Sequence, residues 1–216
     1  TGEGVRPNPA EGEVADWGLV GTINNWGNPE EGQEEGKKDF SMHYDEGGDF
    51  YYYHAIHLPE GAEFKLRADN AWSEVFGPNA LNELPDTIIQ PTTEVEGETV
   101  IDEGANLKVA EGGAGYYTVF FDKTKLVMQP LGFSLRGDAV GGWGEDSNPL
   151  DMVGTPEEVE GGIQFTFEKT VTVVAGELKV KLNAIGEFDG WSVAFGAGDD
   201  GADNFEVEAG NVKITL

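Results

Sequence analysis

The stretch "EGGDFYYYHAIHLPEGAEFKLRA" (residues 46–68) contains two runs of alternating residues joined by the turn sequence "LPEGAE". In "FKLRA", Phe64, Leu66 and Ala68 occupy every second position, and Lys65 and Arg67 lie between them. Successive side chains of a β-strand point to opposite faces, so this pattern predicts a strand with one buried and one polar face. The stretch therefore predicts strands of an antiparallel sheet.

A second copy of this stretch, "EGGIQFTFEKTVTVVAGELKVKLNA", lies at residues 160–184. Three other blocks also recur, and in the same order. The pairs are "LVGTINNWG" (19–27) with "LRGDAVGGWG" (135–144), "WSEVFG" (72–77) with "WSVAFG" (191–196), and "NLKVAEGGAGYYTVFF" (106–121) with "NFEVEAGNVKITL" (204–216). Four blocks repeated in one order predict two homologous domains.

We expect an all-β chain of two tandem antiparallel β-sandwiches. The predicted boundaries are an extended leader over residues 1–15, a first domain over 16–130 and a second over 131–216. The first copy carries a long insertion after its "WSEVFG" block and a further turn and strand, "DKTKLVMQPL", after its last block. The second copy reaches Leu216 before any equivalent of that strand.

The composition agrees with short strands and excludes several functions. The 216 residues include 32 glycines and 10 prolines, which favour many tight turns over long helices. A net charge of −28 argues against a nucleic-acid partner and against an anionic membrane surface, because both carry negative charge. The absence of cysteine excludes disulfides, thiol nucleophiles and Cys-ligated metals. No stretch approaches the roughly 20 apolar residues of a membrane span.

Both copies place tryptophans and cations at equivalent positions. One tryptophan follows a turn, and a second lies in the loop after a strand with two outward basic residues. A flat indole can cover the apolar C–H face of a sugar ring, and Lys or Arg can donate to its hydroxyl and ring oxygens. The candidate glycan-binding residues are Trp26, Lys65, Arg67 and Trp72 in the first copy, and Trp143, Lys179, Lys181, Asn183 and Trp191 in the second.

Two indoles set at an angle suit a curved helical glucan better than a flat ribbon. The alternative is that these tryptophans belong to the core, since indole is often buried. The glycine-flanked turns around Trp26 and Trp143 favour exposure. Phe76 and Phe195, four residues after the second tryptophan of each copy, are expected to be the better core anchors.

The blocks "GDAVGGWGE", "LKVKLNA" and "DNFEVEAGNVKITL" resemble the starch-binding modules of the SusE and SusF outer-membrane lipoproteins of Bacteroidetes. The resemblance extends from about Trp17 to Leu216. It implies immunoglobulin-like β-sandwich modules that bind α-glucan without cleaving it, and no cofactor. It also implies display at the cell surface through a lipid anchor upstream of this chain, beside glycan-uptake proteins. The stacking tryptophans and basic donors that it implies are the candidate residues given above.

Two other functions remain open from the sequence. A glycoside hydrolase needs two carboxylates across the scissile bond, and no pair recurs at matched positions in both copies. A calcium-dependent structural or adhesion module is suggested by the acidic loop "GAGDDGADN" (196–204), whose hard oxygens suit calcium. The spacing of His54 and His57 in "HAIH" places them on opposite strand faces, which is poor for joint metal ligation.

Overall fold

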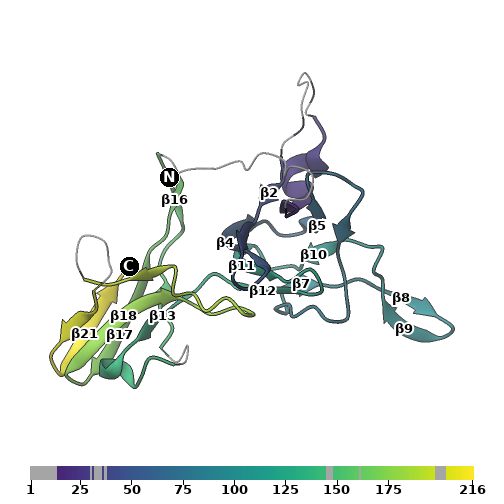
Figure 1. Ribbon diagram of the computed structural model, residues 1–216. Helices are drawn as coiled ribbons and strands as arrows, with labels where there is room; N and C mark the ends of the chain where they lie inside the picture. The colour runs from purple at the N-terminus through teal and green to yellow at the C-terminus, as the bar shows by residue number, and fades with distance from the viewer. Residues whose placement is uncertain are drawn as a thin grey trace. The chain divides into compact units, whose positions relative to one another are not determined.

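The computed structural model describes residues 14–29, 31, 36, 38–144, 148–160, 162–197 and 203–216. Contacts divide these residues into two compact units that meet in the sequence between Pro130 and Leu131 (Figure 1). We call residues 14–130 the N-terminal unit and residues 131–216 the C-terminal unit. Both consist of antiparallel strands, so the predicted all-β sandwich fold is confirmed. Residues 1–13 of the expected leader lie outside the described residues, and the carbonyl of Ala15 already accepts the Tyr51 hydroxyl at 2.8 Å.

The N-terminal unit contains two sheets and a separate hairpin. The first sheet has the order β2-β1-β5-β10-β7, with β6 paired to β5, and the second has the order β12-β11-β4-β3. Strands β8 and β9 form the hairpin, within the insertion of the first copy. The strands are β1 (Trp17–Gly21), β2 (Phe40–Ser41), β3 (His43–Asp45), β4 (Phe50–Leu58), β5 (Glu63–Ala68), β6 (Val75–Phe76), β7 (Ile88–Ile89), β8 (Thr92–Val95), β9 (Glu98–Ile101), β10 (Leu107–Val109), β11 (Gly115–Phe121) and β12 (Leu126–Pro130).

The alternation in β5 produces the predicted core face. Phe64 and Leu66 are fully buried, and Leu66 lies opposite the equally buried Leu19 of β1. Trp17 is also a core residue, with its ring centroid 4.9 Å from that of Phe121 on the other sheet. The hydrophobic core therefore lies between the two sheets.

The C-terminal unit repeats this plan with fewer strands. One sheet has the order β13-β18-β19, with β20 also paired to β18, and the other has the order β14-β17-β21. Strands β15 and β16 form a hairpin. The strands are β13 (Phe133–Arg136), β14 (Asp151–Met152), β15 (Glu157–Val159), β16 (Gly162–Gln164), β17 (Phe167–Val173), β18 (Gly176–Leu182), β19 (Ala194–Phe195), β20 (Phe205–Val207) and β21 (Gly210–Thr215).

Helical structure is confined to two 3-10 segments, η1 (Thr22–Gly27) and η2 (Asp138–Val140), in the part of the chain that the structure describes. Each follows the first strand of its unit and leads toward the first tryptophan of the repeat. No helix within the described ranges is long and apolar enough to span a membrane.

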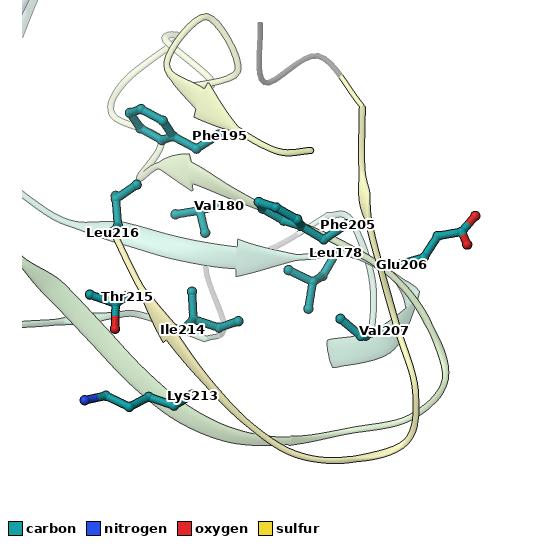
Figure 2. Close-up of a pocket in the computed structure, with 10 residues that line it drawn as sticks. All are labelled: Leu178, Val180, Phe195, Phe205, Glu206, Val207, Lys213, Ile214, Thr215 and Leu216. Carbon is teal, nitrogen blue, oxygen red and sulfur yellow. The ribbon is translucent and has the colours of Figure 1, made fainter. Parts of the chain in front are cut away.

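The C-terminal sandwich has an open apolar cavity of about 300 Å³ between its sheets (Figure 2). In the N-terminal unit β12 pairs with β11 and buries Leu126 and Met128 in the core. The corresponding strand β21 has no second partner strand among the described residues. Phe195 lines the cavity and is 42% exposed, so the expectation that it anchors the core was wrong. Phe76 packs on the N-terminal core as expected.

A glycine is required directly after β13, the first strand of the C-terminal unit. Gly137 has φ +133° and ψ 169°, a backbone region used almost only by glycine. A Cβ atom there would lie 2.1 Å from the carbonyl oxygen of Glu177. We expect Gly137→Ala to lower the free energy of unfolding of the C-terminal unit by about 2–4 kcal/mol.

Urea denaturation followed by near-UV circular dichroism measures this effect. Gly144→Ala is the matched control, since a Cβ atom at Gly144 meets nothing within 4 Å. Equal, small effects of the two substitutions would contradict the steric argument.

Candidate functional site

The N-terminal unit brings Trp26 and Trp72 together. Trp26 belongs to η1, and Trp72 follows β5 by a short turn. Their ring centroids are 6.2 Å apart with an angle of 35° between the ring planes. Trp72 is 54% exposed and Trp26 is half-buried, so the pair forms a tilted aromatic surface open to solvent. The alternative that these two tryptophans belong to the core does not agree with this placement.

The loop that carries Trp26 is held by Asn24. The Asn24 side chain is buried, its Oδ1 accepts the Gly21 N–H at 2.9 Å, and its Nδ2 donates to the carbonyl of Lys38 at 3.2 Å. Asn25 and Trp26 have φ of 52° and 57°. Left-handed backbone is unfavourable for a tryptophan, so the orientation of this indole depends on the contacts that hold the loop.

Arg67 lies behind Trp72 and not in open solvent. Its guanidinium carbon is 4.6 Å from the centroid of the Trp72 ring, within cation–π distance. Its Nε and Nη2 donate to Asp39 at 2.6 and 2.8 Å. Both side chains are buried, and burial raises the pKa of Asp39 while the hydrogen bonds and charge of Arg67 oppose that rise.

The C-terminal unit repeats the aromatic geometry. The ring centroids of Trp143 and Trp191 are also 6.2 Å apart, with an angle of 38° between the planes. Trp191 is 37% exposed and Trp143 is half-buried. The ammonium of Lys181 lies 5.2 Å from the Trp191 centroid, which is the position of Arg67 in the other unit. Indole pairs of nearly equal distance and tilt therefore occur in both units.

The loop that carries Trp143 has a different backbone and different hydrogen bonds from the loop that carries Trp26. Gly141 and Gly142 take φ of 101° and 138°, so glycines supply the left-handed backbone that Asn25 and Trp26 supply in η1. The indole N–H of Trp143 donates to Asp138 Oδ1 at 3.1 Å. The backbone N–H of Trp191 donates to Asp189 Oδ1 at 2.9 Å, a contact that holds the loop carrying the second tryptophan.

The surroundings of the Lys181 ammonium shift its pKa. Burial lowers the pKa of Lys181 below its ordinary value of 10.5, the nearby charge of Arg136 lowers it further, and Asp189 acts in the opposite direction. We therefore expect Lys181 to lose its charge, and Trp191 its cationic contact, as the pH rises toward 10.5.

NMR titration of the Lys181 ε-methylene group, assigned with a Lys181→Arg variant, measures this midpoint. A midpoint at or above 10.5 would contradict the burial of the ammonium beneath the indole.

The other candidate binding residues, two lysines and an asparagine, make contacts away from the indole rings. Lys65 donates to the carbonyl of Gly104 at 2.8 Å. Lys179 is half-buried and lies opposite Arg136 in the sheet. Asn183 accepts the Ser134 hydroxyl at 2.6 Å, and Ser134 lies opposite Lys181. Of the basic residues singled out in the sequence, the structure places Arg67 and Lys181 against indole rings.

Sequence reasoning missed Asp39 and Asn24. Asp39 is one of 41 acidic residues and lies outside the repeated blocks, so nothing in its neighbourhood distinguished it. The nearest signal was Gly18, where the second unit has Ser134: a Cβ atom at Gly18 would lie 2.8 Å from Cβ of Asp39. A glycine inside a strand often marks the close approach of another chain segment.

The sequence raised two metal-site alternatives, the histidines of "HAIH" and the acidic loop 196–204. Within the described ranges, no group of three or more His, Asp or Glu side chains is placed to hold a metal ion. His54 stacks near His43 and Tyr52, and burial lowers its pKa to about 4. His57 contacts Tyr116 instead. Asp199 and Asp200 of the acidic loop lie outside the described residues, and Asn204 donates to Glu177 at 2.8 Å.

Comparisons with known proteins found matches among solved structures alone. No protein-family model matches the chain. No curated protein matches it either. Among solved structures, the chain is similar to SusF from Bacteroides thetaiotaomicron, with a TM-score of 0.47 and 19% sequence identity over 93% of this chain. The matched region spans 45% of that SusF chain.

Proposed function

We propose that the protein is a non-catalytic carbohydrate-binding protein in which each unit binds polysaccharide through its indole pair. The two units correspond to two modules, residues 16–130 and 131–216. The observation that carries the proposal is the repetition of one geometry: centroids 6.2 Å apart in both units, with plane angles of 35° and 38°. Core tryptophans would be covered, whereas Trp72 and Trp191 are among the exposed large apolar residues.

The tilt between the indoles favours a curved chain. Each indole can stack on the C–H face of one sugar, since the polarised C–H groups meet the negative face of the ring. Two rings inclined by 35–38° suit neighbouring sugars that turn relative to each other, as in a helical α-glucan. A flat β-linked ribbon favours coplanar rings. We therefore propose a starch-like α-glucan as the ligand.

We call each indole pair, with the cation behind it, a platform. Each platform is small, so binding at a single site is expected to be weak, with a dissociation constant in the micromolar to millimolar range. Two platforms on one chain raise the apparent affinity for a polymer, because the second contact forms at high effective concentration. The sequence resemblance extends the proposal to display at the outer-membrane surface through a lipid anchor, where the protein would present glycan to uptake proteins.

Affinity gel electrophoresis with amylopectin, glycogen, pullulan, dextran, hydroxyethyl cellulose and xylan tests the ligand class. We expect retardation by the first three polymers and free migration in the others. Retardation only in the β-linked polymers would overturn the α-glucan assignment. Free migration in all six gels would overturn carbohydrate binding of this class.

Two further measurements separate the alternative functions. Incubation with the retarding polymer should release no reducing sugar; release of reducing ends would instead indicate a glycoside hydrolase. Thermal unfolding should shift with maltoheptaose and not with calcium chloride. The reverse pattern would favour a calcium-dependent module.

A further inference from the structure

The buried ion pair behind Trp72 contacts both loops that carry indoles. Arg67 stacks on Trp72, and its Nη2 lies so close to Gly27 that a Cβ atom there would be 2.3 Å away. Gly27 directly follows Trp26. The guanidinium therefore fills the space between one indole and the backbone that carries the other.

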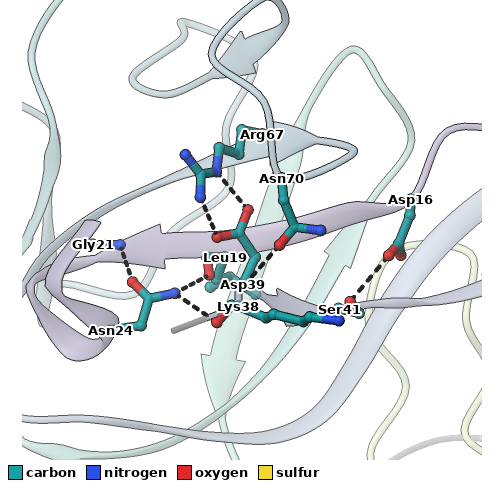
Figure 3. A network of polar contacts seen from close by, with 9 residues as sticks. All are labelled: Asp16, Leu19, Gly21, Asn24, Lys38, Asp39, Ser41, Arg67 and Asn70. Atoms are coloured by element: carbon teal, nitrogen blue, oxygen red, sulfur yellow. Dashed lines mark hydrogen bonds and ion pairs between the residues drawn. The ribbon is translucent and has the colours of Figure 1, made fainter. Parts of the chain in front are cut away.

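The orientation of Arg67 is set by Asp39. The carboxylate engages the Nε and Nη2 edge of the guanidinium, as the two parallel dashed lines in Figure 3 show. A bidentate pair fixes the plane of a guanidinium, which a single contact does not. That plane is the surface on which Trp72 rests.

Asp39 is in turn connected to both indole loops. Its backbone N–H donates to Asn70 Oδ1 at 3.0 Å, and Asn70 lies in the turn two residues before Trp72 (Figure 3). The carbonyl of the preceding Lys38 accepts Asn24 Nδ2, from the loop of Trp26. Gly18 leaves the space that Asp39 occupies beneath these contacts.

The C-terminal unit has a lysine, Lys181, at the position of Arg67. Lys181 donates to the main-chain carbonyl of Asp189, and Ser134 stands where the N-terminal unit has Gly18. Since an ammonium is not planar, Lys181 cannot present a fixed flat surface to Trp191. The two platforms thus share their indole geometry but differ in how it is held.

We propose that Asp39 is a positioning residue of the N-terminal glycan platform, which acts through Arg67 to fix the tilt of Trp72 against Trp26. The inference rests on the proposed function for its consequence in binding. Its structural part concerns the indole pair and can be measured without sugar.

The test uses the full chain with Trp143→Phe and Trp191→Phe, which remove the indole pair of the C-terminal unit. The remaining pair, Trp26 and Trp72, then gives the exciton couplet, which is the pair of circular dichroism bands of opposite sign produced by two neighbouring indoles. Asp39→Asn should remove most of this couplet and weaken binding of maltoheptaose about tenfold. Asp16→Asn is the matched control: Asp16 is also a buried acid of this unit, 8% exposed, and accepts from Ser41 at 3.1 Å. It should leave the couplet and the affinity unchanged.

Each outcome decides the proposal. An unchanged couplet in Asp39→Asn overturns it, even if binding falls, because the loss of binding would then not arise from the indole geometry. Equal loss of the couplet in Asp39→Asn and Asp16→Asn also overturns it, as a general loss of structure. Loss in Asp39→Asn alone supports positioning. If the unsubstituted protein shows the couplet but no maltoheptaose binding, the proposed function fails while the positioning role is still measured by the couplet.

A second variant covers the case in which Asp39→Asn does not fold. Arg67→Lys keeps the opposite charge beside Asp39 but removes the planar fork. We expect it to fold and to lose the couplet. A retained couplet in Arg67→Lys would overturn the proposal, because a fixed guanidinium plane would then be unnecessary.

Discussion

Replacing Trp72 and Trp191 together by alanine is expected to abolish retardation of the protein in an amylopectin gel. These are the more exposed rings of their pairs, at 54% and 37%. Truncating an aromatic anchor typically costs about 2 kcal/mol or more of binding free energy, which is a factor of roughly 30. Loss of both anchors leaves no intact platform in either unit.

The single variants should show the contribution of paired sites. Each should lose binding of maltoheptaose at its own site, as measured by isothermal titration calorimetry, and leave the other site unchanged. On the polymer each should lose more than half of the retardation, because the gain from simultaneous binding disappears with either site.

Trp17→Phe is the control for these substitutions. Trp17 lies in the core, 5% exposed, against Phe121. Its replacement should lower stability but leave retardation intact. If the Trp72→Ala and Trp191→Ala double variant migrates as the unsubstituted protein does, the indole pairs are not the binding sites.

Replacing Arg67 by methionine is expected to destabilise the N-terminal unit by about 3–5 kcal/mol, because Asp39 is left as an uncompensated buried charge. The side chains of Arg67 and Asp39 are 5% and 2% exposed. Burial already raises the pKa of Asp39, and without Arg67 that pKa must rise further. The destabilisation should therefore be greatest at neutral pH and shrink in acid, where Asp39 binds a proton. Urea denaturation at several pH values measures both effects.

Two variants check the origin of this loss. Lys65→Met, on the same strand, should cost little, since Lys65 donates to a backbone carbonyl near the surface. Adding Asp39→Asn to Arg67→Met should recover part of the stability. A loss in Arg67→Met no larger than in Lys65→Met would show that Asp39 is not effectively buried.

The strands of this chain could be predicted from the alternation of apolar and polar residues alone. Phe64 and Leu66 alternate with Lys65 and Arg67, and the structure places the first two in the core and the others on the opposite face. The repetition of four blocks likewise predicted that Trp26 and Trp143 would occupy equivalent places. These inferences succeed because alternation and repetition are local properties that a single strand or loop expresses.

The contacts and burial of individual side chains could not be predicted in the same way. Lys65 and Arg67 look alike in the sequence, yet their contacts differ. Lys65 donates to the carbonyl of Gly104, and Arg67 is held by Asp39, which directly precedes β2, a strand that β5 does not pair with. Phe76 and Phe195 occupy equivalent positions, yet Phe76 packs on the core against Phe121, whereas Phe195 lines an open cavity and is 42% exposed.

The order of residues thus specified the β-strands, the duplication and the presence of paired indoles, since each depends on side-chain periodicity within one segment. The distance and tilt between the rings, and the burial of the cations behind them, arise from segments far apart in the chain. Asp39, Asn70 and Gly27 meet around Arg67 because β1, β2 and β5, which these residues flank or lie beside, are neighbours in one sheet. No spacing rule connects them, because their contacts are selected by the space and charge that remain once the core has formed.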